Sequence, residues 1–310
     1  MKVAIYGVWH VHADDYTKAA LEHGEVVGVY EENEARRKEF CEKYNLPEFK
    51  TPEALLKSDA EGVIVCCSSD THADAMIAIA NAGKHIFTEK VLALTNADCE
   101  RIEAAVNKNG VKFVISLFQK YGAAQCTMKK IADSGELGKI NFLRFRNSHS
   151  GSIGDWLPQH FYNRKECGGG AMIDLGAHGM YLTHWFLGMP DAFSSTFTIA
   201  HENAKNTDGI EDNAVTVMTY KNGTIAINET GFVSYKCPKM LELDGTAGYA
   251  RMEGTHVYKQ TKTTNGEWLE VTLEEELPRP IVQFLTDKIE DGCGMEDAKA
   301  LTYMMVEAYK

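Results

Sequence analysis

Asp174 and His178 are the two ionisable side chains in this sequence whose spacing most directly suggests chemistry. They follow three consecutive glycines at 168–170, and the residues around them predict a long, largely apolar helix over 171–187. Side chains four residues apart lie on one face of a helix, and a carboxylate beside an imidazole can transfer protons near neutral pH. An ion pair that only stabilises the helix would have the same spacing. We favour acid–base chemistry, because a polar pair on an apolar helix requires a specific partner.

A second candidate group lies in the turn at residues 7–12, near the start of the chain. The apolar run at 3–6 predicts a buried strand, and residues 12–23 predict a helix. A dinucleotide-binding turn has the pattern Gly-x-Gly-x-x-Gly, and its pyrophosphate lies at the helix N-terminus. Trp9 and His12 replace two of the three glycines, so the turn fits either a dinucleotide site or a plain strand-to-helix connection. The residues of this turn expected to contact a cofactor are Gly7, Val8, Trp9 and His10.

Glu31 directly follows the second predicted strand, at 25–30. In dinucleotide-binding domains an acidic residue about 20 residues after the glycine turn hydrogen-bonds the adenosine ribose. A carboxylate would repel a 2′-phosphate, so Glu31 favours NAD over NADP. The alternative is a solvent-exposed glutamate without a ligand. The sequence therefore predicts NAD as the cofactor, with NADP the less favoured choice.

Polar residues also follow the next two strong strands, predicted at 62–67 and 85–88. Small hydroxyl side chains and an imidazole come after the first of these, where they can approach a nicotinamide or ribose or cap the following helix. A glutamate and a lysine come after the second. Ligands of open α/β sheets bind at the carboxyl ends of the strands, so all of these residues belong to the predicted cofactor site. They are Ser68, Ser69, His72, Glu89 and Lys90.

The elements that must position these residues alternate between strand and helix as far as the predicted strand at 112–117. This alternation predicts an α/β fold with a Rossmann-type, doubly wound parallel sheet. The later pattern is α+β, with a helix at 123–134 and successive, mostly antiparallel strands over 192–273. We predict a dinucleotide-binding domain over 1–118 and a substrate-binding domain over 119–310. The last two helices are predicted at 280–291 and 296–309.

The composition is that of an ordinary soluble protein, with 44% hydrophobic and 25% charged residues in a chain of 310. A net charge of −12 argues against nucleic acid as a partner, which would require clustered Lys and Arg. No apolar stretch reaches the ~18 residues of a membrane span, and no signal peptide is visible. The eight scattered cysteines are expected to be free thiols. We therefore expect a cytoplasmic protein with neither a nucleic acid nor a membrane as its partner.

The order of these motifs resembles that of the Gfo/Idh/MocA family of sugar oxidoreductases, which includes glucose–fructose oxidoreductase and inositol dehydrogenase. The resemblance covers nearly the whole chain. Its most specific parts are the Gly-Lys-His stretch at 83–85, which runs into Glu89 and Lys90, and the Gly-Gly-Gly to Asp-Leu-Gly-x-His stretch at 168–178. The resemblance implies a Rossmann domain followed by a domain with a large open sheet. That sheet would form the interface of a homodimer or homotetramer.

The resemblance also implies roles for individual residues. Lys90 would lie near the nicotinamide and the substrate hydroxyl, where it would stabilise the developing alkoxide. His178 would be the general base that takes the hydroxyl proton as hydride leaves carbon, and Asp174 would bind substrate or orient the base. The implied activity is NAD-dependent hydride transfer between nicotinamide and a secondary hydroxyl of a sugar, polyol or sugar derivative.

Two other functions fit the same motifs. One is a redox-assisted glycosidase or lyase in which bound NAD is transiently reduced and then regenerated. The other is a non-catalytic ligand sensor that keeps the cofactor fold. The intact set of Lys90, Asp174 and His178 argues against a sensor, since a sensor need not retain an acid–base group.

The sequence departs from the family pattern at several positions. Val91 stands where the family has a proline after the lysine. Gln119 and Lys120 stand where many relatives carry an arginine, so we expect Lys120 to contact the substrate. Trp156 lies in the loop before the helix of Asp174, and it is either a platform that stacks on a sugar face or an ordinary core aromatic.

His10 and His12 would also suit a metal ion, because the His-x-His spacing places both rings on one side of an extended segment. Such a site needs a third ligand, which the sequence does not identify. We therefore predict no metal and expect His10 to reach into the substrate pocket.

Overall fold

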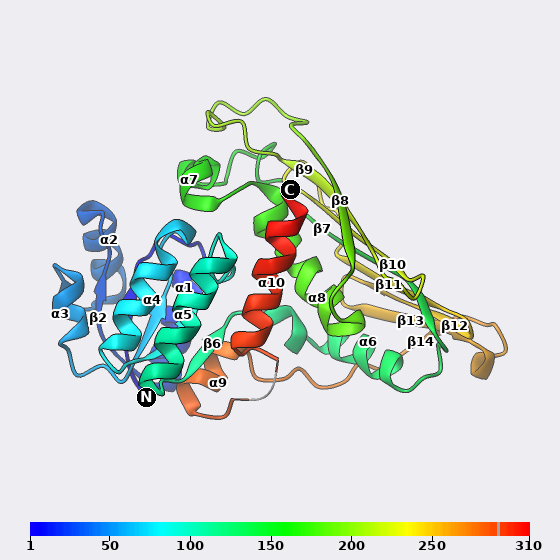
Figure 1. Cartoon of the computed structure of the whole chain (residues 1–310), viewed down its shortest axis with the longest axis horizontal. Coiled ribbons are helices and arrows are strands. Elements are labelled where there is room, and N and C mark those ends of the chain that lie inside the picture. Colours follow the sequence, from blue (N-terminus) through cyan, green and yellow to red (C-terminus); the bar gives the residue numbers. More distant parts are fainter. Residues whose placement is uncertain (290–291) are drawn as a thin grey trace. The chain divides into compact units, whose positions relative to one another are not determined.

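The computed structural model describes residues 1–289 and 292–310, and the chain forms two compact units (Figure 1). The first unit contains Met1–Leu117 and Pro278–Thr302. The second contains Phe118–Leu277 and Tyr303–Lys310. All eight cysteines are free thiols, as expected. Within the described ranges, every helix is too short or too polar to cross a membrane.

The first unit is built around a six-stranded sheet whose neighbouring strands all run parallel. The strand order β3-β2-β1-β4-β5-β6 reverses direction between β1 and β4. Such a reversal is the topological switch point, outside which the ligands of doubly wound sheets bind. The predicted fold of this part is confirmed. The strands are β1 (Lys2–Tyr6), β2 (Glu25–Tyr30), β3 (Glu48–Phe49), β4 (Gly62–Val65), β5 (His85–Thr88) and β6 (Phe113–Ile115).

Helices follow the strands because each apolar strand must be covered and because capping residues begin the helices. Asn33, Thr51 and Thr95 each accept a hydrogen bond from the backbone N–H three residues later. The α4 and α5 helices pack against each other, as do α1 and the later helix α9. The helices are α1 (Ala13–His23), α2 (Glu34–Tyr44), α3 (Pro52–Leu56), α4 (His72–Asn81), α5 (Asn96–Asn109) and α9 (Pro280–Thr286).

Residues 278–302 pack with the first unit, although the sequence predicts one continuous second domain over 119–310. The Phe284 ring lies 5.9 Å from that of Phe87, and the backbone N–H of Ile115 donates to the carbonyl of Cys293. The sequence assigned this segment to the second domain because it follows that domain in the chain. The apolar residues of α9 show that the helix packs into a hydrophobic core, but the order of elements does not show which of the two cores it joins. Of the helix predicted at 280–291, Pro280–Thr286 is helical and the last two residues lie outside the described ranges.

The second unit contains an eight-stranded sheet in the order β14-β13-β12-β11-β7-β10-β9-β8. Only the β7–β10 pair among these described strands is parallel, so the predicted mostly antiparallel sheet is confirmed. The strands are β7 (Ile140–Ser148), β8 (Ala192–Thr198), β9 (Asn213–Thr219), β10 (Ile225–Gly231), β11 (Met240–Gly245), β12 (Gly248–Glu253), β13 (His256–Thr261) and β14 (Leu269–Glu270).

Helices α6 (Ala123–Asp133) and α8 (Ala177–Leu187) cover one face of this sheet (Figure 1). Leu143 and Phe145 of β7 point to that face and are fully buried. Arg144 alternates with them and pairs instead with Glu229 of β10 at 2.9 Å. The sheet therefore has one apolar, covered face and one open face that carries ion pairs. Helix α7 (Arg164–Cys167) also belongs to the second unit, and α10 (Met295–Ala308) contains the boundary between the two units.

Candidate active site

The turn after β1 folds across the carboxyl ends of β1 and β4, at the switch point of the first unit. Gly7 has a φ of +82°, and an added Cβ would lie 2.5 Å from the backbone nitrogen of Cys67. The backbone N–H groups of Trp9 and His10 both donate to the carbonyl of Cys66, at 3.1 Å. Gly7 therefore has to be glycine, because only glycine combines this φ with so close a neighbouring strand. The later glycines of the usual pattern are absent, and the turn is held by other contacts.

Glu31 is one of these contacts. Its buried carboxylate accepts a hydrogen bond from the backbone N–H of Val8 at 2.8 Å and another from that of Asn33 at 3.0 Å. The guanidinium of Arg36 donates to it at 2.9 Å. The residue expected to bind ribose thus also ties the end of β2 to the turn, which excludes a merely solvent-exposed glutamate. Sequence reasoning missed Arg36, because it lies within a charged surface helix without a distinguishing pattern.

Glu89, at the end of β5, is the centre of a second network around the turn. It is 1% exposed, and its Oε1 lies 2.5 Å from His12 Nδ1 and 3.6 Å from His10 Nδ1. The Tyr16 hydroxyl lies 3.0 Å from the same oxygen, and the backbone N–H of Lys90 donates to Oε2 at 2.8 Å. Sequence reasoning missed this contact because Glu89 and His12 are 77 residues apart.

The protonation of this network follows from its geometry. Burial alone would raise the pKa of Glu89, but the charges of His10 and His12 and the His12 hydrogen bond hold that pKa well below its usual range. Burial and the neighbouring carboxylate raise the pKa of Tyr16 well above its ordinary value. Glu89 is therefore a carboxylate and Tyr16 a neutral hydroxyl at physiological pH.

The segment after Lys90 is supported by His72, which the sequence placed among the cofactor-binding residues. The His72 ring is buried, with Nδ1 2.9 Å from the carbonyl of Val91 and Nε2 3.2 Å from that of Cys67. Burial lowers the pKa of His72, which favours the neutral ring. The Lys90–Val91 peptide is cis. These contacts show that His72 holds the Lys90 segment, and its contact with the cofactor stays a prediction.

Ser68 and Ser69 lie where the sequence predicts, after β4. The Ser68 hydroxyl donates to Asp70 at 2.6 Å, and the Thr71 hydroxyl donates to the carbonyl of Ser68 at 2.9 Å. The side chain of Thr71, the N-cap residue of α4, makes no capping hydrogen bond. The alternative that these residues simply cap the helix is therefore weakened, and both serines remain partly exposed at the carboxyl edge of the sheet.

In the second unit, the long helix predicted at 171–187 begins with a π-helical turn, Met172–Gly176, that continues into α8. Asp174 lies in this turn and His178 in α8. A π-turn closes i to i+5 hydrogen bonds and occurs frequently at functional sites. The pair consequently lacks the regular spacing of an α-helix that the sequence prediction assumed.

Two residues distant in sequence fix this irregular start. The Glu211 carboxylate accepts hydrogen bonds from the backbone N–H groups of Gly170 and Met172, at 2.9 and 3.2 Å. A Cβ on Gly170 would lie 2.0 Å from the Glu211 carbonyl. The Asn228 side chain donates to the carbonyl of Gly176 at 2.7 Å. The glycines that the sequence associates with close approach therefore meet protein backbone and side chains of the same unit.

His178 is 4% exposed, and its Nδ1 lies 2.8 Å from the hydroxyl of Tyr181. That hydroxyl also accepts a hydrogen bond from the backbone N–H of Gln119 at 3.1 Å. Phe118 packs edge-on against the His178 ring, with ring centroids 5.1 Å apart. Tyr181 is thus a direct partner of the predicted base. The sequence did not indicate this role, because in an apolar helix Tyr181 resembles an ordinary core aromatic.

The two predicted substrate residues differ in exposure. Lys120 is 4% exposed and lies in the turn Phe118–Tyr121. Trp156 is 52% exposed, and its indole N–H donates to Ser150 at 3.4 Å. Its exposure excludes the alternative of an ordinary core aromatic.

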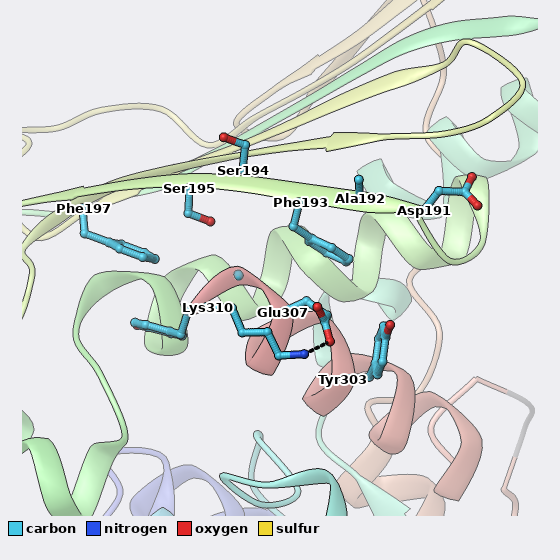
Figure 2. A pocket seen from close by; sticks show the side chains of 11 residues that line it. Asp191, Ala192, Phe193, Ser194, Ser195, Phe197, Tyr303, Glu307 and Lys310 are labelled. Carbon is cyan, nitrogen blue, oxygen red and sulfur yellow. Dashed lines mark hydrogen bonds and ion pairs between the residues drawn. The ribbon is translucent and has the colours of Figure 1, made fainter.

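A separate cavity of about 600 Å³ lies in the second unit between β8 and the end of α10 (Figure 2). Its aromatic lining includes Phe193 and Tyr303, and Lys310 forms an ion pair with Glu307 at its edge. It contains none of the residues predicted for the active site.

Comparison with known protein families decides the classification. Residues 1–117 match the model described as "Oxidoreductase family, NAD-binding Rossmann fold", and residues 126–251 match the "GFO/IDH/MocA C-terminal domain". The chain belongs to the Gfo/Idh/MocA family. The assignment by resemblance is thereby confirmed, together with an NAD-binding Rossmann domain and membership of an oxidoreductase family.

Individual Gfo/Idh/MocA proteins are only distantly similar to the chain. Inositol 2-dehydrogenase from Salmonella typhimurium is 30% identical over 194 residues, which is 60% of this chain and 54% of that protein. The match thus spans about half the length of that relative.

Two solved structures share the fold over nearly their whole length. The aldose-aldose oxidoreductase from Caulobacter crescentus has a TM-score of 0.83 at 18% identity, covering 100% of this chain and 96% of that one. The WlbA dehydrogenase from Bordetella pertussis, in complex with NADH and UDP-GlcNAcA, has a TM-score of 0.78 at 17% identity, covering 99% and 95%.

Proposed function

We propose that this chain is an NAD-dependent dehydrogenase that oxidises a secondary hydroxyl of a sugar, polyol or sugar derivative. The observation that carries the proposal is the turn at the switch point, closed on one side by Glu31 and flanked by Lys90. Family membership supports the reaction type, since two of the relatives are named inositol 2-dehydrogenase and myo-inositol 2-dehydrogenase. One similar structure holds NADH with a nucleotide sugar.

The residues of the turn fit a dinucleotide. Gly7 allows the close approach of the chain, and Glu31 has about four lone-pair sites, of which Val8, Asn33 and Arg36 occupy three. The fourth is available to a ribose hydroxyl. Trp9 is 7% exposed, so its ring lines the turn rather than projecting into solvent. Bound NAD would supply the hydride acceptor.

Side chains of the protein would accept the substrate hydroxyl proton and stabilise the negative charge that develops on the alkoxide oxygen. His178 takes the hydroxyl proton if its Nε2 carries the lone pair, which requires Nδ1–H to donate to Tyr181. The Tyr181 oxygen has two lone pairs and can accept from both His178 and Gln119. Tyr181 is therefore a positioning residue that selects the basic tautomer. Lys90 stabilises the alkoxide electrostatically, and Asp174 binds substrate hydroxyls or orients His178.

Calorimetric binding of NAD and NADP to the full chain tests the cofactor, and a panel of sugars and polyols read at the NADH absorbance tests the reaction. We expect NAD to bind more tightly than NADP. A protein that binds neither nucleotide would overturn the proposal. Cleavage of a glycoside without net NADH would instead indicate a redox-assisted glycosidase or lyase with recycled NAD, and cofactor binding without any turnover would indicate a sensor.

Glu31→Gln is expected to weaken NAD binding about tenfold, because a charge-assisted hydrogen bond to the ribose becomes a neutral one. The NAD-to-NADP preference should fall further, since the repulsion of the 2′-phosphate disappears and Arg36 remains. Calorimetry with both nucleotides measures the change. Glu32→Gln, at the exposed neighbouring position, is the matched control. An unchanged ratio of NAD to NADP affinity in Glu31→Gln would show that this carboxylate does not hydrogen-bond the ribose.

We also propose that the open face of the eight-stranded sheet forms a homodimer or homotetramer. Val215, Val217 and Ile227 alternate with buried residues and remain partly exposed there, and Ile227 pairs with Val217 across β10 and β9. Light scattering should give a molar mass of at least twice 34.5 kDa. Val217→Asp with Ile227→Asp should shift it to the monomer, because burying two carboxylates in an interface is costly. Leu21→Asp, on α1 of the first unit, should leave it unchanged.

A further inference from the structure

Three side chains with metal-binding atoms meet beside the turn of the first unit. His10, His12 and Glu89 each offer one ligand atom, and these atoms all lie within 4.8 Å of one another. The imidazole rings of His10 and His12 have centroids 4.7 Å apart. The sequence supplies the His-x-His pair but no third ligand; the fold adds Glu89 from the end of β5. We propose that His10, His12 and Glu89 bind a divalent transition-metal ion of the Zn²⁺ class.

The ligand set favours such an ion over Mg²⁺ or Ca²⁺. Imidazole nitrogen suits zinc and other first-row transition metals, whereas Mg²⁺ and Ca²⁺ take oxygen ligands. Two histidines and one carboxylate are also the protein ligands of several catalytic zinc sites, which keep a fourth position for water or substrate. With three protein ligands, the proposed site would leave one coordination position for an exogenous oxygen ligand.

The surroundings provide orientation and access. The Tyr16 hydroxyl donates to Glu89 Oε1 at 3.0 Å and lies 2.7 Å from the Ser116 hydroxyl, and the Lys90 N–H donates to the other carboxylate oxygen. Outer hydrogen bonds of this kind position metal ligands and raise affinity. Glu89 and His10 have 1% and 8% of their side chains exposed, but His12 has 29%, which provides an entry path.

Metal binding would require both histidine rings to move, because the backbone N–H of His12 donates to His10 Nδ1 at 3.2 Å. Two atoms bound to a tetrahedral zinc at about 2.0–2.1 Å lie about 3.3 Å apart, whereas His12 Nδ1 and Glu89 Oε1 are 2.5 Å apart. The His12 ring is the most exposed of the three and can rotate to open this distance. The ring proton of a neutral His12 would then lie on Nε2, and the His12–Glu89 hydrogen bond would be replaced by one bond from each residue to the ion.

The proposal goes beyond the proposed dehydrogenase function and does not depend on it. His10 and Glu89 are also expected to contact the cofactor, so metal binding has to be measured without nucleotide. Zn²⁺ is titrated by competition with a chromogenic chelator into full-length protein that has been treated with chelator and then freed of it. Co²⁺ is added separately as a spectroscopic probe.

We expect one equivalent of Zn²⁺ to bind, and Co²⁺ to give visible bands of a four- or five-coordinate site without the thiolate charge-transfer bands that cysteine ligation produces. Mg²⁺ should not compete. His12→Asn and Glu89→Gln should each weaken Zn²⁺ affinity by at least about tenfold, whereas His23→Asn, at the far end of α1, should have no effect. Circular dichroism establishes that each variant is folded. His10→Asn serves as the second ligand variant should Glu89→Gln not fold.

Two results would overturn the site: wild-type protein that does not compete with the chelator for Zn²⁺, or affinity unchanged in the folded ligand variants. The three residues would then be a hydrogen-bonded network that holds the turn. NAD binding by metal-free protein is measured in parallel, so a failure of the metal site and a failure of the proposed dehydrogenase function remain distinguishable.

Discussion

Replacing His178 with glutamine is expected to lower kcat by about 10²- to 10⁴-fold, because the hydroxyl proton loses its acceptor during hydride transfer. NAD affinity should stay within about twofold, since the replacement removes a proton acceptor rather than a cofactor contact. The pH dependence of kcat should lose the limb that reports the general base. Steady-state rates across pH, with the substrate identified by the panel, measure both effects.

The controls for His178 come from the same helix. His184→Gln, also on α8, should retain the wild-type rate. Tyr181→Phe should lower kcat less than His178→Gln and shift the pH profile, because the ring would lose the partner that selects its tautomer. Wild-type turnover by His178→Gln would exclude this histidine as the base.

Lys90→Met is the second large effect expected. Removal of a preorganised charge beside a developing alkoxide typically costs about 10²- to 10³-fold in kcat, and Met keeps the length of the aliphatic stem. Because Lys90 is 5% exposed, the neutral side chain should fit its site without a loss of packing. Stopped-flow measurement of NADH formation separates hydride transfer from product release.

Lys112→Met is the matched control, since Lys112 is an exposed lysine of the same unit that forms an ion pair with Asp287. It should leave hydride transfer unchanged. An unaltered rate in Lys90→Met would contradict electrostatic stabilisation by this lysine, and the resemblance would then have misassigned its role.

The sequence predicts the architecture well where the signals are local. Buried parallel strands appear as continuous apolar runs, and glycines or capping residues mark most helix ends, as at Thr51 and Gly110. The strand ends that carry Glu31, Ser68 and Glu89 follow directly from those runs. This is why the residues of the first unit could be assigned to one edge of a sheet without structural information.

The contacts that shape the site could not be predicted, because they join distant positions. Glu89 reaches His12 across 77 residues, and Glu211 reaches Gly170 across 41. The π-turn depends on a hydrogen bond from Asn228, and this role can be recognised only once β10 is known to pack against α8. The packing of residues 278–302 with the first unit is equally non-local, since an apolar helix shows that it needs a core but not which one.

The dependence of the turn on Glu89 has a consequence for protein engineering. Consensus design would restore glycine at positions 9 and 12 on the evidence of related sequences. In this chain, removing His12 would deprive the buried Glu89 carboxylate of its closest hydrogen-bond partner, and a buried acceptor left without a partner costs about 1–3 kcal/mol. A transplanted glycine turn would therefore have to supply another hydrogen-bond donor or cation for the Glu89 carboxylate. A segment exchanged between relatives should therefore include both the turn and the end of β5.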